Sequence, residues 1–568
     1  MKNKKVISID GTPFEQTTAD QNGGFIALGY CGNHYKVYSP IQQQEVSLSP
    51  TQFTENMLKT VCGVDWCEFY YTDPLPEKGQ NPFDYKGLTA IIMKACQDKG
   101  LYKQSRERRL GVWPAADGKG LRINGRELWQ EQGKCLHRGL IDGDIYPAGG
   151  DIGFGPDTPL ASQKEVNRIL LAFNSLEYRQ DLVPEMMLGW FACSVTAAAL
   201  KRRPHIYLTG EAGIGKTTIL NLMRNLLGPL AYTATGPQSM ASFYQSLNNT
   251  TRAVILDEFE ADSASRSNRD TLEIARQSYS LSVEDGGIQR GSVSGGPKSY
   301  RFFSPFFAAG VLPARLDEAD RSRWVVVEAT GQRKDLASSN LTEEEARNLG
   351  ARLAATVIRR WSLVQESLQT LREAVMISGG DGRIADTVGP LLAGYWTLVS
   401  DKPASLDDAL TLVGLANIEQ RIEQREEKDK FRCLEVLLTK VYSLPVVEGN
   451  YLAQVSLSLA EAFQKICANP TNCLELQNRL AQLGLRVSYK DDAWKVFIAN
   501  SPDHQELRKI FRGTKWQNGG WSMTLRRLAG GEESTQRLSG SSRPVKVTVF
   551  DMPRHLLPST ASDNPLAA

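Results

Sequence analysis

Apolar and polar positions along the middle of the chain predict buried strands joined by amphipathic helices. Short apolar runs typical of buried strands stand at 205–209, 253–256, 302–310 and 323–327. The residues from 218 to 223 have helical spacing and directly follow the first strand and a glycine-rich turn. Strands that alternate with helices in this way indicate an α/β fold built on a parallel sheet.

Different patterns flank this region. Turn-rich sequence with short alternating runs up to about residue 50, followed by a helix predicted at 88–99, indicates a small α+β unit. Capping boxes at Ser162 and Thr342 begin further helices, and the second opens a long helical stretch. From residue 431 onward helices are followed by short alternating strands, a pattern typical of a winged-helix module.

A glycine-rich loop joins the strand at 205–209 to the helix that follows it. It consists of Gly210, Glu211, Ala212, Gly213, Ile214, Gly215, Lys216 and Thr217, and Thr218 comes next. Glycines between a strand and a helix let successive backbone N–H groups converge on a phosphate, and the helix N-terminus adds partial positive charge. Lys216 is expected to bind β- and γ-phosphate oxygens, and the Thr217 hydroxyl to bind Mg²⁺. We therefore predict that the chain binds ATP with Mg²⁺ and hydrolyses it.

The strand at 253–256 is followed by two adjacent carboxylates, Asp257 and Glu258. Nucleotide hydrolysis needs both, because Asp257 is expected to hold Mg²⁺ while Glu258 orients and deprotonates the attacking water. A strand that ends in Asp-Glu is common by chance. In combination with the glycine-rich loop it predicts an ATPase.

Two arginines, Arg321 and Arg323, lie at the start of the last predicted strand. An arginine supplied by a neighbouring subunit can stabilise the charge that develops on the γ-phosphate. One of the two is expected to take this role, which implies a ring or another homo-oligomer. The alternative is a surface charge cluster with Asp317, Glu318 and Asp320.

The segment 286–301 reads as a glycine-rich hairpin with three basic residues and a tyrosine. In a ring ATPase such a hairpin can face the central channel and follow the phosphates of a DNA strand. The candidate DNA contacts are Gln289, Arg290, Lys298 and Arg301. A plain flexible connection is equally consistent with the sequence.

The order of these motifs resembles the superfamily 3 helicases, and more closely the helicase half of the primase-helicases encoded by phages, prophages and plasmids. Further segments that fit this group are 109–113, 124–128, 203–210, 272–277, 319–323, 391–394, 511–516, 519–521 and 525–528. The resemblance implies a P-loop NTPase core with a superfamily 3 or AAA+-like parallel sheet. It also implies a hexameric, ATP-driven DNA helicase that replicates a mobile element. The roles given above carry over to the loop, to both carboxylates and to one of the two arginines.

Two features depart from the pattern of this superfamily. Its polar sensor, usually an asparagine at the tip of the strand before Pro313, falls here on Gly310, with Arg383 as a speculative substitute. The N-terminal segment has no zinc-ribbon cysteines and no acidic catalytic cluster, so we do not expect priming activity. The expected partners are single-stranded or forked DNA, further copies of the chain, and a separate primase or host replication proteins.

Composition narrows the class of protein. The 568 residues carry a net charge of +2, so any nucleic-acid-binding surface must be local. The nine cysteines form no CxxC pair, which indicates a reducing compartment rather than a disulfide framework. The apolar run at 186–200 is too short to span a bilayer, and no secretory signal follows the N-terminal residues. We expect a cytoplasmic protein without a membrane partner.

The expected domain organisation follows from these patterns. It comprises a small α+β domain at 1–160, a helical lead-in at 161–203, the ATPase core at 204–330, a helical domain at 331–430, a winged-helix-like domain at 431–555 and a disordered tail at 556–568. Within the fifth segment, Trp516 and Trp521 are expected to belong to the core rather than to stack on bases. Two other functions remain open: an AAA+-like ATP switch that remodels proteins, such as a helicase loader or phage-defence ATPase, and a replication-initiator module.

Overall fold

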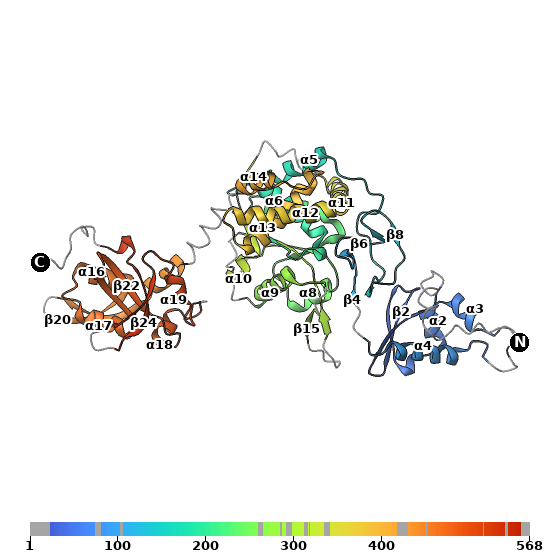
Figure 1. Ribbon diagram of the computed structural model, residues 1–568, viewed down its shortest axis with the longest axis horizontal. Helices are drawn as coiled ribbons and strands as arrows, with labels where there is room; N and C mark the ends of the chain where they lie inside the picture. Colours follow the sequence, from blue (N-terminus) through green and yellow to red (C-terminus); the bar gives the residue numbers. More distant parts are fainter. Residues whose placement is uncertain are drawn as a thin grey trace. The chain divides into compact units, whose positions relative to one another are not determined.

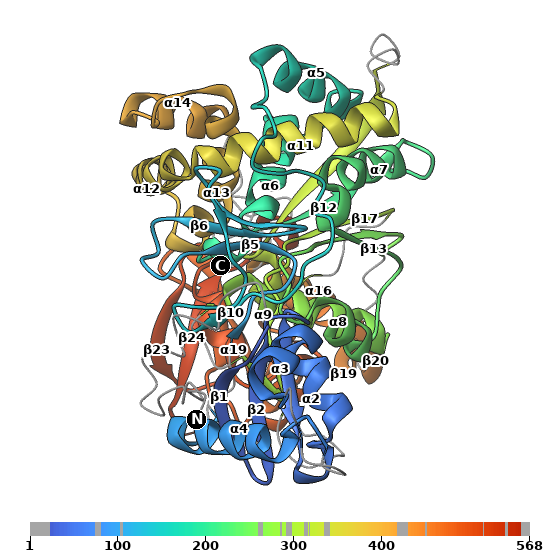
Figure 2. The same ribbon diagram turned by 90° about the vertical axis from the view of Figure 1, so that its right-hand side faces the viewer.

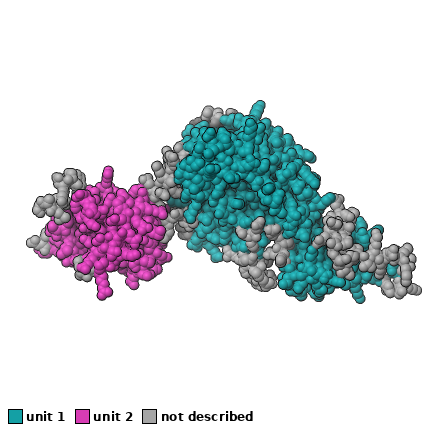
Figure 3. Space-filling model, in the orientation of Figure 1, with its two compact units in different colours: residues 1–418 teal, residues 419–568 magenta. Residues whose placement is uncertain are grey.

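The chain folds into two compact units of mixed α/β structure, residues 1–418 and 419–568 (Figure 3). This computed structural model describes residues 23–73, 76, 81–102, 106–259, 265–283, 287–290, 298–311, 316, 318–333, 341–416, 430–448, 451–514, 516–539 and 543–557. Among the helices in these ranges, none combines the length and the apolar character needed to cross a membrane.

The N-terminal part of the first unit is an antiparallel sheet that shares its core with three helices. The strands, in the order β1-β2-β3, are β1 (Ile26–Cys31), β2 (His34–Ser39) and β3 (Gln44–Leu48). The helices are α2 (Glu55–Cys62), α3 (Val64–Tyr71) and α4 (Tyr85–Lys99) (Figure 1). Val37, Leu58, Trp66 and Leu88 pack in the common core. The helix predicted at 88–99 is confirmed as α4, which begins three residues earlier because Asp84 caps its N-terminus.

The residues from 106 to 145 form short strands that pack on the following part of the chain. One sheet contains β5 (Gly111–Pro114), β6 (Leu121–Asn124), β7 (Leu128–Gln130) and β8 (Cys135–Leu136), and a second contains β4 (Arg106–Glu107), β10 (Asp144–Ile145) and β9 (Leu140–Ile141). Trp113 and Tyr146 share a hydrophobic cluster with Ala198 and Phe303. The segment grouped above as 1–160 therefore contains residues whose packing partners lie beyond position 160.

A six-stranded sheet forms the centre of the first unit (Figure 2). Its order is β11 (Leu176–Tyr178), β18 (Trp324–Gln332), β12 (His205–Thr209), β17 (Phe306–Gly310), β14 (Ala253–Asp257) and β13 (Ala231–Thr235). The last five strands pair in parallel, and β11 pairs antiparallel with β18. The described α-helices between β12 and β18 are α7 (Lys216–Leu227), α8 (Met240–Leu247), α9 (Arg266–Ser280) and α10 (Glu318–Arg321).

Helices from two separate sequence segments form one layer beside this sheet (Figure 2). They are α5 (Gln163–Phe173), α6 (Val183–Val195), α11 (Glu343–Arg359), α12 (Trp361–Ile377), α13 (Gly382–Val399) and α14 (Leu406–Leu415). Both predicted capping boxes are confirmed, at the starts of α5 and α11. Helices α6 and α13 approach so closely that a Cβ at Gly189 would lie 1.8 Å from the Leu391 carbonyl oxygen. The helical lead-in and the helical region therefore pack as one body.

The second unit has a sheet of four antiparallel strands and a separate hairpin. A helix that ends at residue 438 precedes the hairpin β19 (Val441–Glu448) and β20 (Tyr451–Ser458), which leads into α16 (Leu459–Ala468) and α17 (Leu474–Gln482). The sheet order is β21 (Leu485–Lys490), β22 (Ala493–Ala499), β24 (Val545–Asp551) and β23 (Glu532–Gln536), with α18 (Gln505–Ile510) and α19 (Gly520–Leu525) between β22 and β23. Trp516 and Trp521 are buried in the core of this unit, as expected. Residues 558–568 of the predicted tail lie outside the described residues.

Candidate functional site

The glycine-rich loop leaves the carboxyl end of β12 and enters α7, the strand-to-helix context that its sequence predicts. Gly213 and Gly215 have φ angles of +78° and +106°, which favour glycine because a Cβ would strain the backbone there. Nothing lies within 4 Å of the position where a Cβ at Gly213 would stand. The loop therefore leaves open space at the N-terminus of α7, where the first backbone N–H groups of a helix are available to an anion.

The two predicted motifs meet at this edge of the sheet. The Thr217 hydroxyl donates a 2.9 Å hydrogen bond to Oδ2 of Asp257, across 40 positions of sequence. The Lys216 ammonium folds back on the loop and donates to the carbonyl oxygens of Gly210 and Glu211, at 2.7 and 2.8 Å. A hydroxyl and a carboxylate side by side are the hard oxygen ligands that Mg²⁺ prefers. The residues present therefore fit a magnesium ion bound together with a triphosphate.

Glu258 follows Asp257 in an unusual backbone conformation. Its φ is +53°, its backbone N–H donates to Oδ1 of Asp257 at 3.0 Å, and its side chain is exposed. A non-glycine residue in this region of backbone space is uncommon and stands where surrounding structure holds it. The turn thus sends adjacent carboxylates in different directions, which lets Asp257 face Thr217 while Glu258 remains exposed.

The strand order explains why a ligand fits at this edge. The chain passes from β17, on one side of β12, to β18, on its other side. Crevices at the carboxyl ends of parallel strands form where the direction of winding reverses in this way. The loop after β12 occupies that point, and β14, which carries Asp257, is separated from β12 by one strand.

Gln332 belongs to the same edge and was not predicted from the sequence. Its side-chain amide, at the end of β18, donates to the carbonyl oxygen of Gly213 at 3.3 Å. The expected core ended at residue 330, two residues before Gln332. Strand β18 continues beyond its pairing with β12, and Gln332 stands opposite Leu176 of β11, beside the loop.

Gly310, where the resembled superfamily carries its sensor, stands at the end of β17 between the two motif strands. A Cβ at this position would lie 2.3 Å from the Tyr207 hydroxyl and 2.6 Å from the carbonyl oxygen of Phe259. Tyr207 donates a 2.8 Å hydrogen bond to that same carbonyl. The space that a sensor side chain would need is therefore filled by a buried tyrosine and its acceptor.

The two candidate arginines lie at the opposite edge of the sheet from the glycine-rich loop. In the parallel pairing of β12 with β18, His205 stands opposite Trp324 and Thr209 opposite Glu328. Arg321 and Arg323 come just before Trp324, whereas the loop begins just after Thr209. Five residues of parallel strand span about 16 Å, well beyond the length of an arginine side chain. Neither arginine can therefore reach the loop of its own chain.

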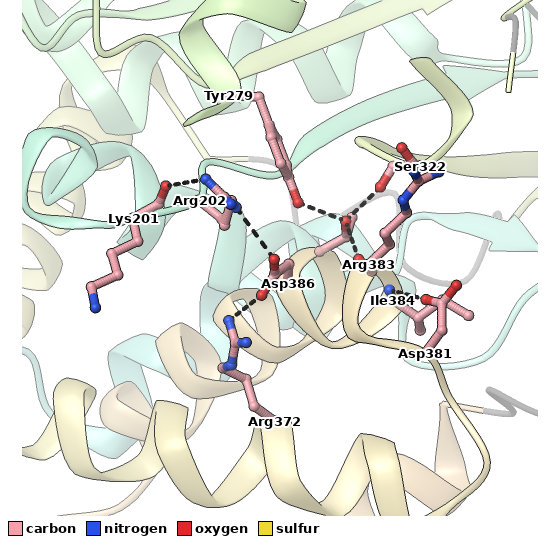
Figure 4. A network of polar contacts seen from close by, with 10 residues as sticks. Lys201, Arg202, Tyr279, Ser322, Arg372, Asp381, Arg383, Ile384 and Asp386 are labelled. Carbon is pink, nitrogen blue, oxygen red and sulfur yellow. Dashed lines mark hydrogen bonds and ion pairs between the residues drawn. The ribbon is translucent and has the colours of Figure 1, made fainter. Parts of the chain in front are cut away.

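The segment that carries these arginines is held by α9 and α13. Arg276 binds both carboxylate oxygens of Asp320, at 3.0 and 2.9 Å, and Asp320 is 2% exposed. The Thr387 hydroxyl bonds to the Tyr279 hydroxyl at 3.2 Å and donates to the carbonyl oxygen of Ser322 at 2.7 Å (Figure 4). The turn between Asp320 and Ser322 is thus fixed on both sides of Arg321.

Arg323 makes contacts within its own chain. Its guanidinium lies 5.5 Å from the centroid of the Tyr279 ring, and its carbonyl oxygen accepts the N–H of His205 at 3.0 Å. Burial lowers the pKa of Arg323, and the nearby Asp320 carboxylate acts in the opposite direction. Arg321 is half-buried at the end of α10.

Arg383 lies in the same neighbourhood and not beside the glycine-rich loop. Its carbonyl oxygen accepts from the Thr387 hydroxyl, which also donates to the carbonyl oxygen of Ser322 (Figure 4). On the adjoining turn of α13, Asp386 binds both Arg202 and Arg372. Because this end of α13 packs at the amino edge of the sheet, Arg383 cannot substitute for a sensor in its own chain.

The predicted hairpin exists as a short antiparallel pair, β15 (Ile288–Arg290) and β16 (Lys298–Tyr300). Arg290 stands opposite Lys298 at the last pair of the ladder. The side chains of Gln289, Arg290 and Lys298 lie outside the described residues.

Arg301, expected to contact DNA with them, is only 7% exposed, so this prediction is wrong. It lies at the base of the hairpin, where its backbone N–H donates to the Asn248 side chain at 3.0 Å and its carbonyl oxygen accepts from Asn249 at 2.7 Å.

Comparisons with known proteins give no family for the chain. No family model matches it, and no curated protein matches it. Among solved structures, it is similar to the apo structure of the C-terminal region of NrS-1, residues 305–718, with 11% identity and a TM-score of 0.29 over 77% of this chain and 95% of that one. An A-form apo structure of the same region has 11% identity and a TM-score of 0.28, over 75% and 94%. Similarity at this level carries no inference about function, which must come from the site.

Proposed function

We propose that the chain is an ATP-driven DNA helicase or translocase, that it works as a ring of identical subunits, and that it replicates a phage or another mobile element. The observation that supports this most is the 2.9 Å hydrogen bond between Thr217 and Asp257, with Lys216 adjacent in the chain. Two motifs predicted independently meet at the carboxyl edge of a parallel sheet, where nucleotides bind in such folds.

The roles of the residues follow from their positions. The backbone N–H groups of the loop and the start of α7 bind the phosphates, and Lys216 exchanges its two carbonyl acceptors for phosphate oxygens. Thr217 and Asp257 hold Mg²⁺, which neutralises charge on the phosphates when it is bound. Exposed Glu258 orients a water molecule and accepts its proton.

An oligomer is part of the proposal because the site is incomplete in one chain. Arg321 and Arg323 lie about 16 Å along the sheet from the loop, so either can stabilise charge on a γ-phosphate only in a neighbouring subunit. A contact in which one face of a subunit meets a different face of the next is head-to-tail, and such contacts form a ring when the rotation between neighbours closes.

The DNA contact proposed for the first unit is the hairpin β15–β16. Arg290 and Lys298 stand opposite one another in the strand ladder, and the loop between them contains no acidic residue. Paired cations on a projecting hairpin are suited to the phosphates of a single strand. Arg290 and Lys298 are therefore proposed to contact DNA, together with Gln289, which lies beside Arg290 on β15.

Nucleotide binding and hydrolysis by four proteins test this proposal. The wild-type chain is expected to bind and hydrolyse ATP with Mg²⁺. Lys216→Ala should lose nucleotide affinity, whereas Glu258→Gln should bind ATP and fail to hydrolyse it, because only the group that activates water has changed. Lys201→Ala, an exposed lysine outside the site, is the matched control and should behave as the wild type. Equal hydrolysis by all four proteins would exclude the site.

A further inference from the structure

The second unit carries a strongly basic stretch that the proposed ATPase does not use. Residues 508–527 contain six basic residues and no aspartate or glutamate. The basic residues are Arg508, Lys509, Arg512, Lys515, Arg526 and Arg527. The chain as a whole is close to neutral, with a net charge of +2, so this concentration of one sign is local.

The fold brings the two ends of this stretch together. The Phe511 ring, directly after α18, stacks on Trp521 of α19, with centroids 5.4 Å apart and an interplanar angle of 9°. The Trp521 indole donates to the carbonyl oxygen of Ala499 at 2.8 Å, and the Thr548 hydroxyl donates to that of Ser522 at 3.2 Å. The stacked rings therefore bring the end of α18 against α19, and the basic residues of the stretch come from these two helices and the residues that adjoin them.

Half of these charges have no carboxylate beside them. Lys509 pairs with Glu506 at 2.7 Å, and Arg526 pairs with Glu533 at 3.1 Å. Three exposed arginines, Arg508, Arg512 and Arg527, form no ion pair with any residue that the structure describes. We call these three residues the α18–α19 basic face.

Grouping like charges on a surface costs free energy unless an anion is present. Charges closer than a Debye length, about 8 Å at physiological salt, repel one another appreciably. A plain solvated surface carries both signs interspersed. Arg508 lies in the last turn of α18, and Arg512 follows the helix by two residues, so both arginines lie at the C-terminal end of this helix.

We propose that the α18–α19 basic face binds the phosphate backbone of a nucleic acid, without reading its sequence. Guanidinium groups match phosphate oxygens in a bidentate geometry. The two tryptophans of the stretch, Trp516 and Trp521, are buried and cannot stack on bases, so the surface offers charge and no aromatic stacking platform. This inference concerns the second unit alone and does not depend on the proposed ATPase.

A second feature directs the contact to this face. The tip of the β21–β22 hairpin carries the opposite charge. Here the tip consists of Asp491 and Asp492, both exposed and both with positive φ in a two-residue turn. Two carboxylates repel phosphates, so this hairpin tip does not compete with the α18–α19 basic face for a phosphate backbone.

Salt dependence of binding tests the proposal. The full-length chain without nucleotide is titrated into a labelled duplex, single strand and RNA of matched sequence over a series of salt concentrations. The test variant is Arg508→Gln/Arg512→Gln/Arg527→Gln. The control removes the same charge from exposed residues elsewhere in the unit, as Arg432→Gln/Lys490→Gln/Arg554→Gln.

Each phosphate contact contributes about 0.9 to the slope of log K against log salt for a duplex, so the triple variant should lower that slope by about 2 to 3. The control should keep the wild-type slope, and the three nucleic acids show which form the face prefers. Equal slopes for the test and control variants would overturn the proposal, as would the absence of nucleic-acid binding by the wild type. Should the triple variant fail to fold, each single substitution should lower the slope by about 0.9, and Arg512→Lys should restore it.

Discussion

Mixing two inactive variants tests whether the nucleotide site of one subunit is completed by an arginine of the next subunit. The first is Lys216→Ala, which loses the phosphate-binding lysine and keeps both arginines. The second is Arg321→Ala/Arg323→Ala, which keeps the loop and loses the arginines. Because the arginines lie about 16 Å along β12–β18 from the loop of their own chain, each interface in a ring needs the loop of one subunit and an arginine of the next.

The expected recovery follows from this geometry. Each variant alone should be inactive, because loss of an arginine at the γ-phosphate costs about 10³-fold or more in turnover. In an equal mixture, an interface works only when the loop comes from the arginine variant and the arginine from the lysine variant. The probability is one half for each subunit, so roughly a quarter of the interfaces should be competent. Activity should follow the product of the two fractions and peak at equal amounts.

Steady-state ATP hydrolysis is measured across mixing ratios, with the variants combined before assembly. A mixture of Lys216→Ala with Glu258→Gln is the control. Both residues belong to the same chain's half of the site, so no interface in that mixture is complete and no activity should return. The mixture of Lys216→Ala with Arg321→Ala/Arg323→Ala could instead hydrolyse ATP no faster than the sum of the two variants measured separately. That result at every mixing ratio would refute an arginine supplied by the neighbouring subunit.

Three further predictions concern single positions. Gly310→Ala places a Cβ 2.3 Å from the Tyr207 hydroxyl and should lower the free energy of unfolding, measured by chemical denaturation, by about 1–3 kcal/mol. The control Gly382→Ala, whose Cβ would have nothing within 4 Å, should leave it unchanged. Equal stabilities of the two variants would contradict the close approach at Gly310. Asp257→Asn should make nucleotide binding insensitive to chelation of Mg²⁺ and reduce hydrolysis by about 100-fold, and retained chelator sensitivity would place the metal elsewhere. Burial lowers the pKa of His205 from 6.5 to about 3, so stability should fall by about 1.4 kcal/mol per pH unit as pH drops from 6.5 toward 3. His205→Asn should flatten that slope in denaturation curves, and an unchanged slope would show that His205 takes up its proton in the folded state.

The sign of the His205 effect follows from its hydrogen bonds. The neutral ring lies between the Ala275 carbonyl oxygen, 2.9 Å from Nε2, and the Phe306 N–H, which donates to Nδ1 at 3.1 Å. These two partners fix the tautomer with the proton on Nε2. Below pH 6.5 the unfolded chain binds a proton that the folded chain does not accept until about pH 3. Acid therefore favours the unfolded chain over this window.

Local sequence signals predicted the centre of the candidate site. The glycine-rich loop and the Asp257–Glu258 pair were recognisable because each is a short motif at the end of an apolar run, and parallel strands bring their carboxyl ends to one edge. The order of the strands was not predicted, because it depends on contacts between residues far apart in the chain. For the same reason nothing in the sequence pointed to Gln332, which reaches Gly213 only through the register of β18.

Long-range packing also explains what sequence reasoning missed. Arg301 looked like one of several basic residues in a turn, yet its backbone is tied to Asn248 and Asn249 and its side chain is buried. The sequence of the small strands from 106 to 145 does not indicate what they pack against, and Trp113 contacts Phe303, three residues before β17. The sequence shows the chemistry of a charged or aromatic side chain, but it does not show which residues that side chain packs against.

The central claim is that this site hydrolyses ATP to move along DNA. The most direct measurement is ATP hydrolysis by the full-length chain with and without single-stranded DNA, with Lys216→Ala and Glu258→Gln as controls. The account predicts stimulation of several-fold by DNA, lost in both variants. Hydrolysis that is abolished in both variants but indifferent to DNA would contradict a DNA motor and favour an ATP switch that remodels proteins.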